Sequence, residues 1–466
     1  MLTYRYPLYQ VPPCASFAEF LETSYLRYRN RTAFEEEQTQ WSYEELYDSV
    51  RKIIAQFGSK RGCYFCLTAE HPFLFCVAYL ALVITGNIVV LTSGVERTKH
   101  KDYPEINDSM VLHCLGETLM GDIPFFSEPD AICTVAQSSG TTSVAKGVML
   151  SQKNLLSDMC AGMNCYEYPD GARYYHILPY YHLFGLVADM LAPLYSGGTI
   201  CFSQNSYAFF RNLRQFHPDN LNLPPAMADI LAQLLEKSEG KDITGGNLSK
   251  IMCAGSALTE NTQSILIRYG IQALSAYGLT ECSPCVSMSR DMDWKLGSAG
   301  VIIPCCEVRI VDGEITVHGE NVMLGYWNDP DATRKVIRNG WLYTGDLGYL
   351  DEDGFLFLTG RKSNLIVFED GTKLFPEMVE AEISCVPGIR ECVILERKRN
   401  RRTMVELILC MDSSSSMMEP THRARVLLEK HCLPGNILSV TLSKQPLARN
   451  RLGKLDRKRY SDGNID

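Results

Sequence analysis

The stretch AICTVAQSSGTTSVAKGVML, residues 131–150, joins two short apolar runs through a loop of small polar residues. AICTVAQ (131–137) and KGVML (146–150) each predict a buried strand. Ser151 then stands where an N-cap precedes the helical pattern that begins QKNLL. The loop SSGTTSVAKG (138–147) offers small residues, hydroxyls and a lysine, which let backbone N–H groups and a cation approach phosphate oxygens. Loops of this composition also occur without a ligand, so the stretch alone leaves both interpretations open.

Other parts of the first two-thirds of the chain repeat this alternation of apolar runs and loops. KIMCAG (250–255) and YYHILP (174–179) each predict a strand that runs into a loop. FLFCVAYLALVITGNIVVL (73–91) is interrupted by Thr85 and Gly86, so it predicts a buried helix, a turn and a buried strand. Because a membrane span needs ~20 uninterrupted apolar residues, we expect no span here. The alternation predicts an α/β fold, in which loops at strand ends carry ligands.

The pattern changes near residue 300, where β-hairpins are predicted. EVRIVDGEITVHG (307–319) has two alternating strands joined at Asp312-Gly313, a strong hairpin signal. LGYLDEDGFLFLTG (347–360) repeats the pattern around DEDG. After this second hairpin about 100 residues remain, the size of a small α+β domain. We therefore predict a large α/β domain with a β-rich subdomain at residues 1–361 and a small α+β domain at residues 362–466.

Composition and charge place the chain among ordinary globular proteins. Its 466 residues exceed what one core usually supports, and 46% of them are apolar and 21% charged. The net charge of −9 is uneven. Residues 364–466 hold 17 Lys and Arg against 14 Asp and Glu, whereas residues 1–363 hold 28 against 40. An acidic body with a mildly basic end argues against a general nucleic-acid-binding protein, which is basic throughout.

The 18 cysteines do not predict a disulfide framework. MLTYRYPLYQVPP, residues 1–13, lacks the apolar core of a signal peptide, so we expect a cytoplasmic protein. There the cysteines stay reduced and pack as small apolar groups. Two C-x-x-C pairs occur, at Cys63/Cys66 and Cys282/Cys285, but no histidine stands at metal-ligand spacing from them. The sequence therefore does not favour a zinc site.

Four further short motifs follow the loop at 138–147. They are, in order, YGLTE (277–281), YTGD (343–346), GR (360–361) and LARNRLGKLDRKR (447–459). Each has an ordinary explanation when taken alone, such as a turn, a helix start or a solvated charge. In this order, and together with NVMLGYWNDP (321–330), they resemble the adenylate-forming superfamily of acyl-CoA synthetases, adenylation domains of peptide synthetases and luciferases. The resemblance runs from WSYEELYDSV (41–50) to the last of these motifs, and its motifs look closest to fatty acyl-CoA synthetases.

The resemblance implies a ligase that works in two steps. Members of the superfamily join a carboxylate to the α-phosphate of ATP, which gives an acyl-adenylate and pyrophosphate, and a thiol then displaces AMP. The first step brings an anion against a polyanion, so it depends on positioning and on neutralising charge. The implied cofactor is Mg²⁺, with ATP as co-substrate and CoA as the expected acceptor.

The resemblance also implies which residues take part. ATP contacts are implied for Ser138, Ser139, Gly140, Thr141, Thr142, Lys146, Gly255, Ser256, Tyr277, Gly278, Asp346 and Arg361. The loop residues would hold the β- and γ-phosphates, and Asp346 would accept hydrogen bonds from the ribose hydroxyls. Glu281 would coordinate Mg²⁺, and Thr280 would contact the α-phosphate. Lys454 would bridge the attacking carboxylate and the α-phosphate, in the first step only.

A lysine carried by a separate domain requires a hinge. In the superfamily the small, mobile domain rotates between the two steps, and the hinge position falls at Ser363, where Asp or Lys is usual. Ser143 and Ala145 also depart from the usual Gly and Pro of the phosphate loop, and Ser143 is strained if that position has a positive φ. Ala448 and Asn450 replace a usual Pro and Thr. The loop departures Ser143 and Ala145 motivate an alternative of another class, a nucleotide-binding protein with poor turnover, against which the retained charged groups argue.

The region LPYYHLFG (178–185) matches the branch that activates acyl and aryl acids. The implied acyl pocket includes His182, Gly185 and Cys282. Relatives that activate amino acids place an Asp here to pair the α-ammonium group, whereas this stretch has none before Asp189. We therefore expect a fatty acid as the substrate, with aryl acids as the open alternative.

Two segments of the small domain bear on the acceptor. FEDGTKLFPEMVE (368–380) resembles the segment that faces the thiol tunnel in CoA-using members. RKRNRR (397–402) could meet the phosphates of CoA or the acidic surface of an acyl carrier protein, or it could be a solvated face. We expect CoA, and transfer to an acyl carrier protein is the alternative.

Overall fold

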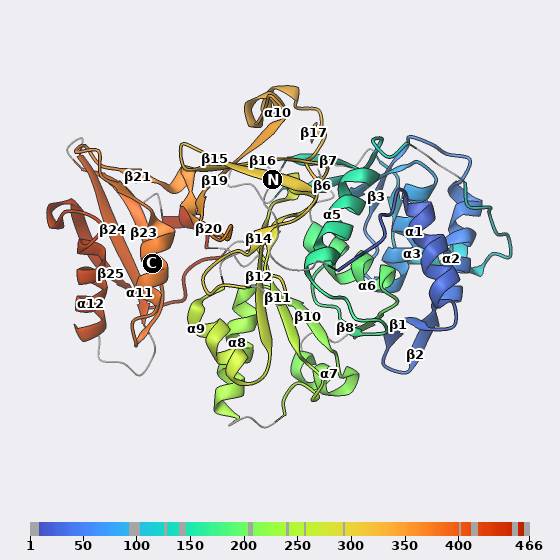
Figure 1. The fold of residues 1–466 in the computed structure, drawn as a ribbon, viewed down its shortest axis with the longest axis horizontal. Coiled ribbons are helices and arrows are strands. Elements are labelled where there is room, and N and C mark those ends of the chain that lie inside the picture. Colours follow the sequence, from blue (N-terminus) through green and yellow to red (C-terminus); the bar gives the residue numbers. More distant parts are fainter. Residues whose placement is uncertain are drawn as a thin grey trace. The chain divides into compact units, whose positions relative to one another are not determined.

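The computed structural model describes residues 9–92, 103–124, 128–138, 146–203, 208–238, 242–255, 258–291, 294–399, 402–411, 418–449 and 455–460. The chain forms two compact units (Figure 1). The first comprises residues 1–308, 317–343 and 352–356, and the second comprises residues 309–316, 344–351 and 357–466. The division therefore runs through the predicted hairpins, and the boundary at 361/362 stays a prediction.

A nine-stranded sheet is the larger sheet of the first unit. Its strands are, in spatial order, β14 (Val301–Ile302), β13 (Cys285–Met288), β12 (Gln272–Gly278), β11 (Lys250–Cys253), β10 (Asn220–Leu223), β8 (Arg173–Tyr175), β9 (Thr199–Phe202), β1 (Thr32–Glu36) and β2 (Thr39–Ser42). The inner strands from β12 to β1 run parallel, and the strands at both ends pair antiparallel. Parallel inner strands are typical of an α/β sheet with helices on its faces.

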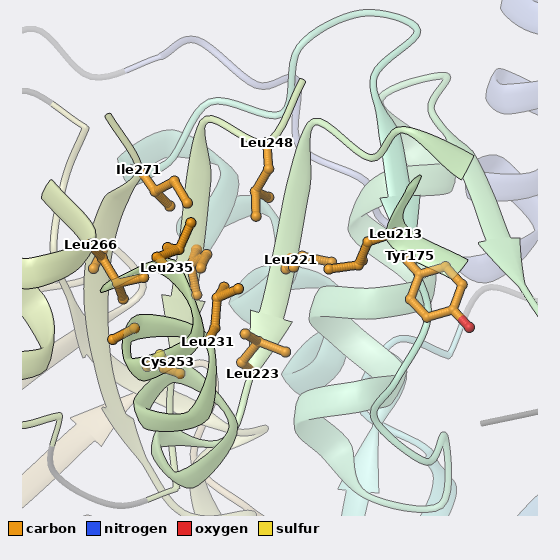
Figure 2. Close-up of a cluster of buried hydrophobic side chains, with 14 of the residues drawn as sticks. Tyr175, Leu213, Leu221, Leu223, Leu231, Leu235, Leu248, Cys253, Leu266 and Ile271 are labelled. Carbon is orange, nitrogen blue, oxygen red and sulfur yellow. The ribbon is translucent and has the colours of Figure 1, made fainter. Parts of the chain in front are cut away.

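One face of this sheet carries a large apolar core (Figure 2). Its helices are α7 (Phe209–Phe216), α8 (Pro225–Lys237) and α9 (Glu260–Arg268). Leu231 and Leu235 project from α8 toward Leu221 and Leu223 of β10, and Leu266 of α9 joins them. Each such side chain contributes about 1.5–3 kcal/mol when fully buried. This core holds β10, β11 and β12 in place, and β12 ends at the candidate site.

A six-stranded sheet forms the other layer of the first unit. Its strands are, in order, β17 (Gly325–Tyr326), β7 (Gly147–Ser151), β6 (Ile132–Gln137), β4 (Ile88–Leu91), β3 (Tyr64–Leu67) and β5 (Glu105–Ile106). The helices of this part are α1 (Phe17–Tyr28), α2 (Tyr43–Phe57), α3 (Pro72–Ile84), α4 (Asp108–Gly116), α5 (Gln152–Cys165), a π-helix (Gly185–Leu191), α6 (Ala192–Tyr195) and α10 (Pro330–Val336). The two strands predicted on either side of the 138–147 loop are confirmed as β6 and β7.

Two local predictions for this unit are confirmed in detail. Ser151 caps α5, because its side chain accepts a hydrogen bond from the Asn154 amide while the Asn154 side chain accepts one from the Ser151 amide. The apolar run at 73–91 forms the wholly buried helix α3, a turn at Gly86 with φ +74°, and β4. Among the described helices, none is long and apolar enough to cross a membrane.

The second unit contains most of a five-stranded sheet and the C-terminal α+β part. The sheet has the order β15 (Cys306–Val311), β16 (Glu314–Gly319), β19 (Trp341–Leu350) and β18 (Ile337–Arg338), with β20 (Leu356–Arg361) also paired to β19. Both predicted hairpins are confirmed, and Asp312 and Gly313 have φ of +52° and +79° at the first turn. The C-terminal part follows with β21 (Ile366–Val367), β22 (Lys373–Leu374), α11 (Pro376–Ser384), β23 (Ile389–Arg399), β24 (Arg402–Met411), α12 (Met418–Glu429) and β25 (Ile437–Ser443).

Cysteines contribute to both cores as the composition predicts. Of the 18 cysteines, Cys66, Cys76 and Cys253 are among the many that are buried in apolar surroundings. Burial raises the pKa of Cys133 to about 12, so this thiol stays neutral at physiological pH. Most cysteines of this chain therefore pack as small apolar side chains, whereas Cys63 and Cys385 are exposed.

Candidate active site

The phosphate-loop candidate is closed at its base by the β6–β7 hairpin. The Ser138 amide donates a hydrogen bond to the Lys146 carbonyl oxygen over 2.9 Å, and the Lys146 amide donates to Ser138 Oγ over 3.3 Å. These two bonds extend the pairing of β6 with β7 to Ser138 and Lys146. Ser139, Gly140, Thr141 and Thr142 lie outside the described residues, as do Ser143, Ala145, Ser256, Asn450 and Lys454. Their roles stay predictions.

Tyr326, to which the sequence motifs assigned no role, contacts both Lys146 and Glu281. The Lys146 ammonium lies over the ring of Tyr326, 4.6 Å from its centroid. The Tyr326 hydroxyl donates a hydrogen bond to Glu281 Oε1 over 2.8 Å. Burial, and then the Glu281 carboxylate, raise the pKa of Tyr326 far above its ordinary value, so the hydroxyl keeps its proton and donates. The only signal for Tyr326 was its place in the motif at 321–330, since a buried tyrosine hydroxyl needs a partner.

Glu281 lies in a 3₁₀ turn, Thr280–Cys282, that follows β12. Its backbone is held because the Met323 amide donates to the Glu281 carbonyl oxygen over 2.9 Å. The Glu281 carboxylate, fixed at a strand end, has the hard oxygen donors that Mg²⁺ prefers. The residues present therefore fit a site at which Glu281 would hold Mg²⁺ bound to nucleotide phosphates.

Three predicted nucleotide contacts, Gly255, Tyr277 and Gly278, lie at or just after the ends of β11 and β12. Gly278 ends β12, and a Cβ there would lie 1.8 Å from the Pro284 carbonyl oxygen, so only glycine fits. Tyr277 beside it is buried. Gly255 follows β11 with φ +91° and open space around it. The structure thus explains both glycines by backbone requirements, and a nucleotide contact remains a prediction for each.

The three acyl-pocket candidates lie on different elements of the first unit. The Leu186 amide donates to the His182 carbonyl oxygen over 2.9 Å, at the start of the π-helix. A Cβ on Gly185 would lie 2.5 Å from the Pro179 carbonyl oxygen, so close backbone packing requires this glycine. Cys282 is completely buried, and burial raises the pKa of its thiol well above the ordinary value. A cavity of about 420 Å³ beside α5, lined in part by Cys14, contains none of the three candidates.

Asp189 is the first aspartate after the 178–185 stretch, and the structure gives its carboxylate partners within the fold. It is almost completely buried within the π-helix. Its Oδ1 accepts a hydrogen bond from Asn222 Nδ2 over 2.7 Å, and its Oδ2 accepts one from the Leu178 amide over 3.3 Å. These bonds explain the buried carboxylate without a substrate ammonium group.

The second unit brings together two predicted ATP contacts. Arg361 Nε lies 2.7 Å from Asp346 Oδ1, because the β19–β20 hairpin places the two residues side by side. Glu314 forms a neighbouring pair that sequence reasoning missed: its carboxylate accepts from the Gly345 amide over 3.0 Å and pairs with Lys362 over 2.7 Å. The Asp346 carboxylate thus pairs with the residue predicted to act beside it.

The hinge candidate and the acceptor segment also lie in the second unit. Ser363 is exposed in a 3₁₀ turn, Lys362–Asn364, and its hydroxyl lies 3.3 Å from Asn364 Oδ1. In the basic stretch at 397–402, Arg397 pairs with Glu406 over 2.7 Å and Lys398 with Glu396 over 2.8 Å. These two charges have partners within the fold, and contact of the stretch with CoA or an acyl carrier protein stays a prediction.

The segments on both sides of Lys454 are held firmly. Arg449 and Leu455 form an antiparallel bridge, and the Asp456 amide donates to the Ala448 carbonyl oxygen over 2.8 Å. Arg457 donates two hydrogen bonds to the buried Glu380 carboxylate, over 2.8 and 2.5 Å. The described residues on either side of Lys454, Arg449 and Leu455, are therefore held next to each other.

The first unit has an α/β fold in which a lysine, a carboxylate and a hydroxyl lie near strand ends. These groups suit a site for a metal–nucleotide complex. Comparison with known proteins agrees with this class. The model of the AMP-binding enzyme family matches residues 92–327, about half of the chain, and the chain belongs to this family. The family predicted from the motifs and the α/β fold class are thereby confirmed.

Named relatives are CoA ligases of different acids. A long-chain-fatty-acid–CoA ligase of Escherichia coli O157:H7 is 30% identical over 279 residues, 56% of this chain and 50% of that protein. The match thus spans about half the length of this relative. A 2-succinylbenzoate–CoA ligase of Bacillus cereus (strain ATCC 10987) is 25% identical over 441 residues, 87% of this chain and 91% of that protein.

Solved structures share the fold over nearly the whole chain. ATP-bound MatB from Rhodopseudomonas palustris superposes with a TM-score of 0.84 at 20% identity, covering 96% of this chain and 98% of that one. The o-succinylbenzoate CoA synthetase from Bacillus subtilis, in complex with an acyl-adenylate, gives 0.80 at 22% identity with the same coverage. At these identities the similarity concerns the fold alone.

Proposed function

We propose that this chain activates a carboxylic acid with ATP and transfers the acyl group to CoA. The observation that carries the proposal is the Lys146–Tyr326–Glu281 arrangement at the phosphate-loop base, in a chain whose named relatives are CoA ligases. A cation and a carboxylate held together suit a polyanion that arrives with a divalent metal. A pure nucleotide-binding protein has no need for the additional lysine motif at Lys454.

In the first step a carboxylate oxygen of the acid attacks the α-phosphorus of ATP. The bond to pyrophosphate breaks, and an acyl-adenylate forms. Lys146 would bind phosphate oxygens, Glu281 would hold Mg²⁺, and Lys454 would lie between the two anions that must meet. When bound, Mg²⁺ neutralises phosphate charge and so makes pyrophosphate a better leaving group.

In the second step the CoA thiol loses its proton, and its sulfur attacks the acyl carbonyl carbon. The bond between that carbon and the phosphate oxygen breaks, which releases AMP and leaves the thioester. Asp346 and Arg361 would hold the ribose through both steps. Ser363 is the proposed point about which residues 362–466 turn between them.

We propose a fatty acid as the substrate, supported by the identity to long-chain-fatty-acid–CoA ligases. An aryl acid is the second candidate, because the 2-succinylbenzoate–CoA ligases match a larger part of the chain. His182 and Cys282 are the proposed pocket residues in either case. The cytoplasmic location expected from the sequence stays a prediction.

The test is pyrophosphate release from MgATP with a panel of acids, with and without CoA. The panel spans short to long fatty acids, benzoates, 2-succinylbenzoate and amino acids. We expect one class of acid to drive release and CoA to give its thioester. If acyl-adenylate accumulates and CoA has no effect, an acyl carrier protein replaces CoA as the proposed acceptor. Absence of release with every acid contradicts the proposal and favours a binding protein.

Lys454→Ala tests the role of the C-terminal lysine, with the exposed Lys444→Ala as a matched control from the same unit. We expect Lys454→Ala to lower acid-dependent pyrophosphate release by about 10²- to 10³-fold, the usual effect of removing a group that stabilises developing charge. Conversion of supplied acyl-adenylate and CoA to the thioester should stay within a few-fold of the unmodified chain. Equal release from both variants contradicts the assignment.

A further inference from the structure

Tyr326 is anchored by its backbone to the strand that follows the phosphate loop. β17 pairs antiparallel with β7, so that Tyr326 lies opposite Val148. The Trp327 amide donates to the Gly147 carbonyl oxygen over 2.8 Å, and the Tyr326 amide donates to Thr333 Oγ1 over 2.8 Å. The position of the Tyr326 ring is therefore tied to the position of the hairpin.

The same short segment is also tied to Glu281. The Met323 amide donates to the Glu281 carbonyl oxygen, three residues before Tyr326 donates its hydroxyl proton to the carboxylate of the same residue. Glu281 is thus held twice, once through its backbone and once through Oε1. Within the described part of the chain, no hydrogen bond is formed by Oε2.

Tyr326 contacts two side chains of opposite charge, Lys146 and Glu281. The ring face attracts the Lys146 ammonium through a cation–π contact. The hydroxyl makes a charge-assisted bond with a carboxylate, which is stronger than a neutral one. A phenylalanine would fill the same space and keep the ring contact, so packing alone does not account for the hydroxyl.

We propose that Tyr326 is a positioning residue that holds Glu281 and Lys146 in one arrangement for a metal–ATP complex. The inference rests on the proposed function. Its hydroxyl restrains the rotation of the Glu281 carboxylate and leaves the second oxygen for the metal. Its ring holds the Lys146 ammonium at a fixed position near the same site. Partners that orient a metal ligand in this way commonly change metal affinity 10- to 100-fold when they are removed.

The test compares Tyr326→Phe with Tyr326→Leu in metal-binding experiments. Mn²⁺ is titrated in the presence of ATP and followed by electron paramagnetic resonance, and metal-free ATP binding is measured by calorimetry. We expect Tyr326→Phe to weaken Mn²⁺ binding about 10- to 100-fold and to leave metal-free ATP binding within two-fold. Tyr326→Leu should weaken both, because it also removes the ring beneath Lys146. Tyr349→Phe, an exposed tyrosine stacked on Phe357, is the matched control.

A double-mutant cycle separates positioning from general packing. We expect the effect of Tyr326→Phe on Mn²⁺ binding to vanish in a Glu281→Gln background, where the carboxylate is absent. An undiminished effect in that background overturns the inference, as does unchanged Mn²⁺ affinity in Tyr326→Phe alone. If the unmodified chain binds ATP neither with nor without metal, the proposed function falls as well, so the two failures are distinguishable. Thermal unfolding of each variant checks that the fold is kept.

Discussion

At the scale of single residues, Asp158 is a buried carboxylate that ties α5 to the turn beyond Glu281. It accepts hydrogen bonds from the Cys285 amide over 3.0 Å and from Asn321 Nδ2 over 3.4 Å. Burial raises the pKa of Asp158 well above its ordinary value, and these two donors only partly oppose the shift. The folded state therefore binds a proton at Asp158 more tightly than the unfolded chain does.

This shift predicts a pH-dependent loss of stability that Asp158→Asn removes. The contribution of Asp158 is fully present below the unfolded pKa of about 4 and is lost as the pH rises through the higher folded pKa. The asparagine stays neutral and can still accept from the Cys285 amide. We expect Asp158→Asn to gain stability relative to the unmodified chain as the pH rises above about 4, measured as the free energy of unfolding in urea. A difference that does not change with pH contradicts the shift.

At the scale of elements, α5 links the phosphate-loop hairpin to the rest of the first unit. It begins one residue after β7, and its capping box satisfies backbone groups at that junction. A weaker cap would loosen the start of the helix that supports β7. The cap is local chemistry, which is why the sequence alone could place it.

Ser151→Ala tests this cap. Loss of a serine N-cap costs about 1 kcal/mol, because an amide of the first turn loses its partner. Ser157→Ala within the same helix is the control, since Ser157 bonds only to carbonyl oxygens of the preceding turn. We expect Ser151→Ala to lower the free energy of unfolding in urea by about 1 kcal/mol. Ser157→Ala should change it by less than about 0.5 kcal/mol. Equal effects would contradict the capping role.

The elements that sequence reasoning placed correctly are those defined by local chemistry. The Asp312-Gly313 turn requires positive φ at both residues, and the break at Gly86 ends a wholly apolar helix. The sequence did not indicate that Tyr326 meets Glu281, because 45 residues separate them and both sheets must form first. The pairing of Asp346 with Arg361 was likewise missed, since each had been assigned to the nucleotide rather than to the other. Contacts within the site depend on tertiary structure, and motif spacing does not encode it.

At the scale of the whole molecule, the side chains proposed to take part in the reaction belong to two different units. Lys146, Tyr326 and Glu281 belong to the first, whereas Asp346 and Lys454 belong to the second. Each unit orders its own share: the first through β17 on β7, and the second through Arg457 on the buried Glu380. The uneven charge of the chain follows the same division, with the basic excess near the C-terminus.

Arg457→Lys tests whether the Arg457–Glu380 pair positions the segment that carries Lys454. The substitution keeps the charge but loses the bidentate geometry. We expect acid-dependent pyrophosphate release to fall about 10-fold, while thioester formation from supplied acyl-adenylate is unchanged, because Lys454 is proposed to act only in the first step. Arg425→Lys, at an exposed pair with Glu429 on α12, is the control. A parallel fall in both steps would indicate a general loss of folding instead.

The most direct test of the central claim is to follow the carboxylate oxygen. The acid that drives pyrophosphate release is supplied with both carboxylate oxygens labelled with ¹⁸O, together with MgATP and CoA, and the AMP is analysed by mass spectrometry. Attack of the carboxylate on the α-phosphorus predicts one ¹⁸O atom in each AMP formed, because the thiol later breaks the bond between carbon and that oxygen. AMP without label, or label in ADP or inorganic phosphate, would contradict the acyl-adenylate and with it the proposed function.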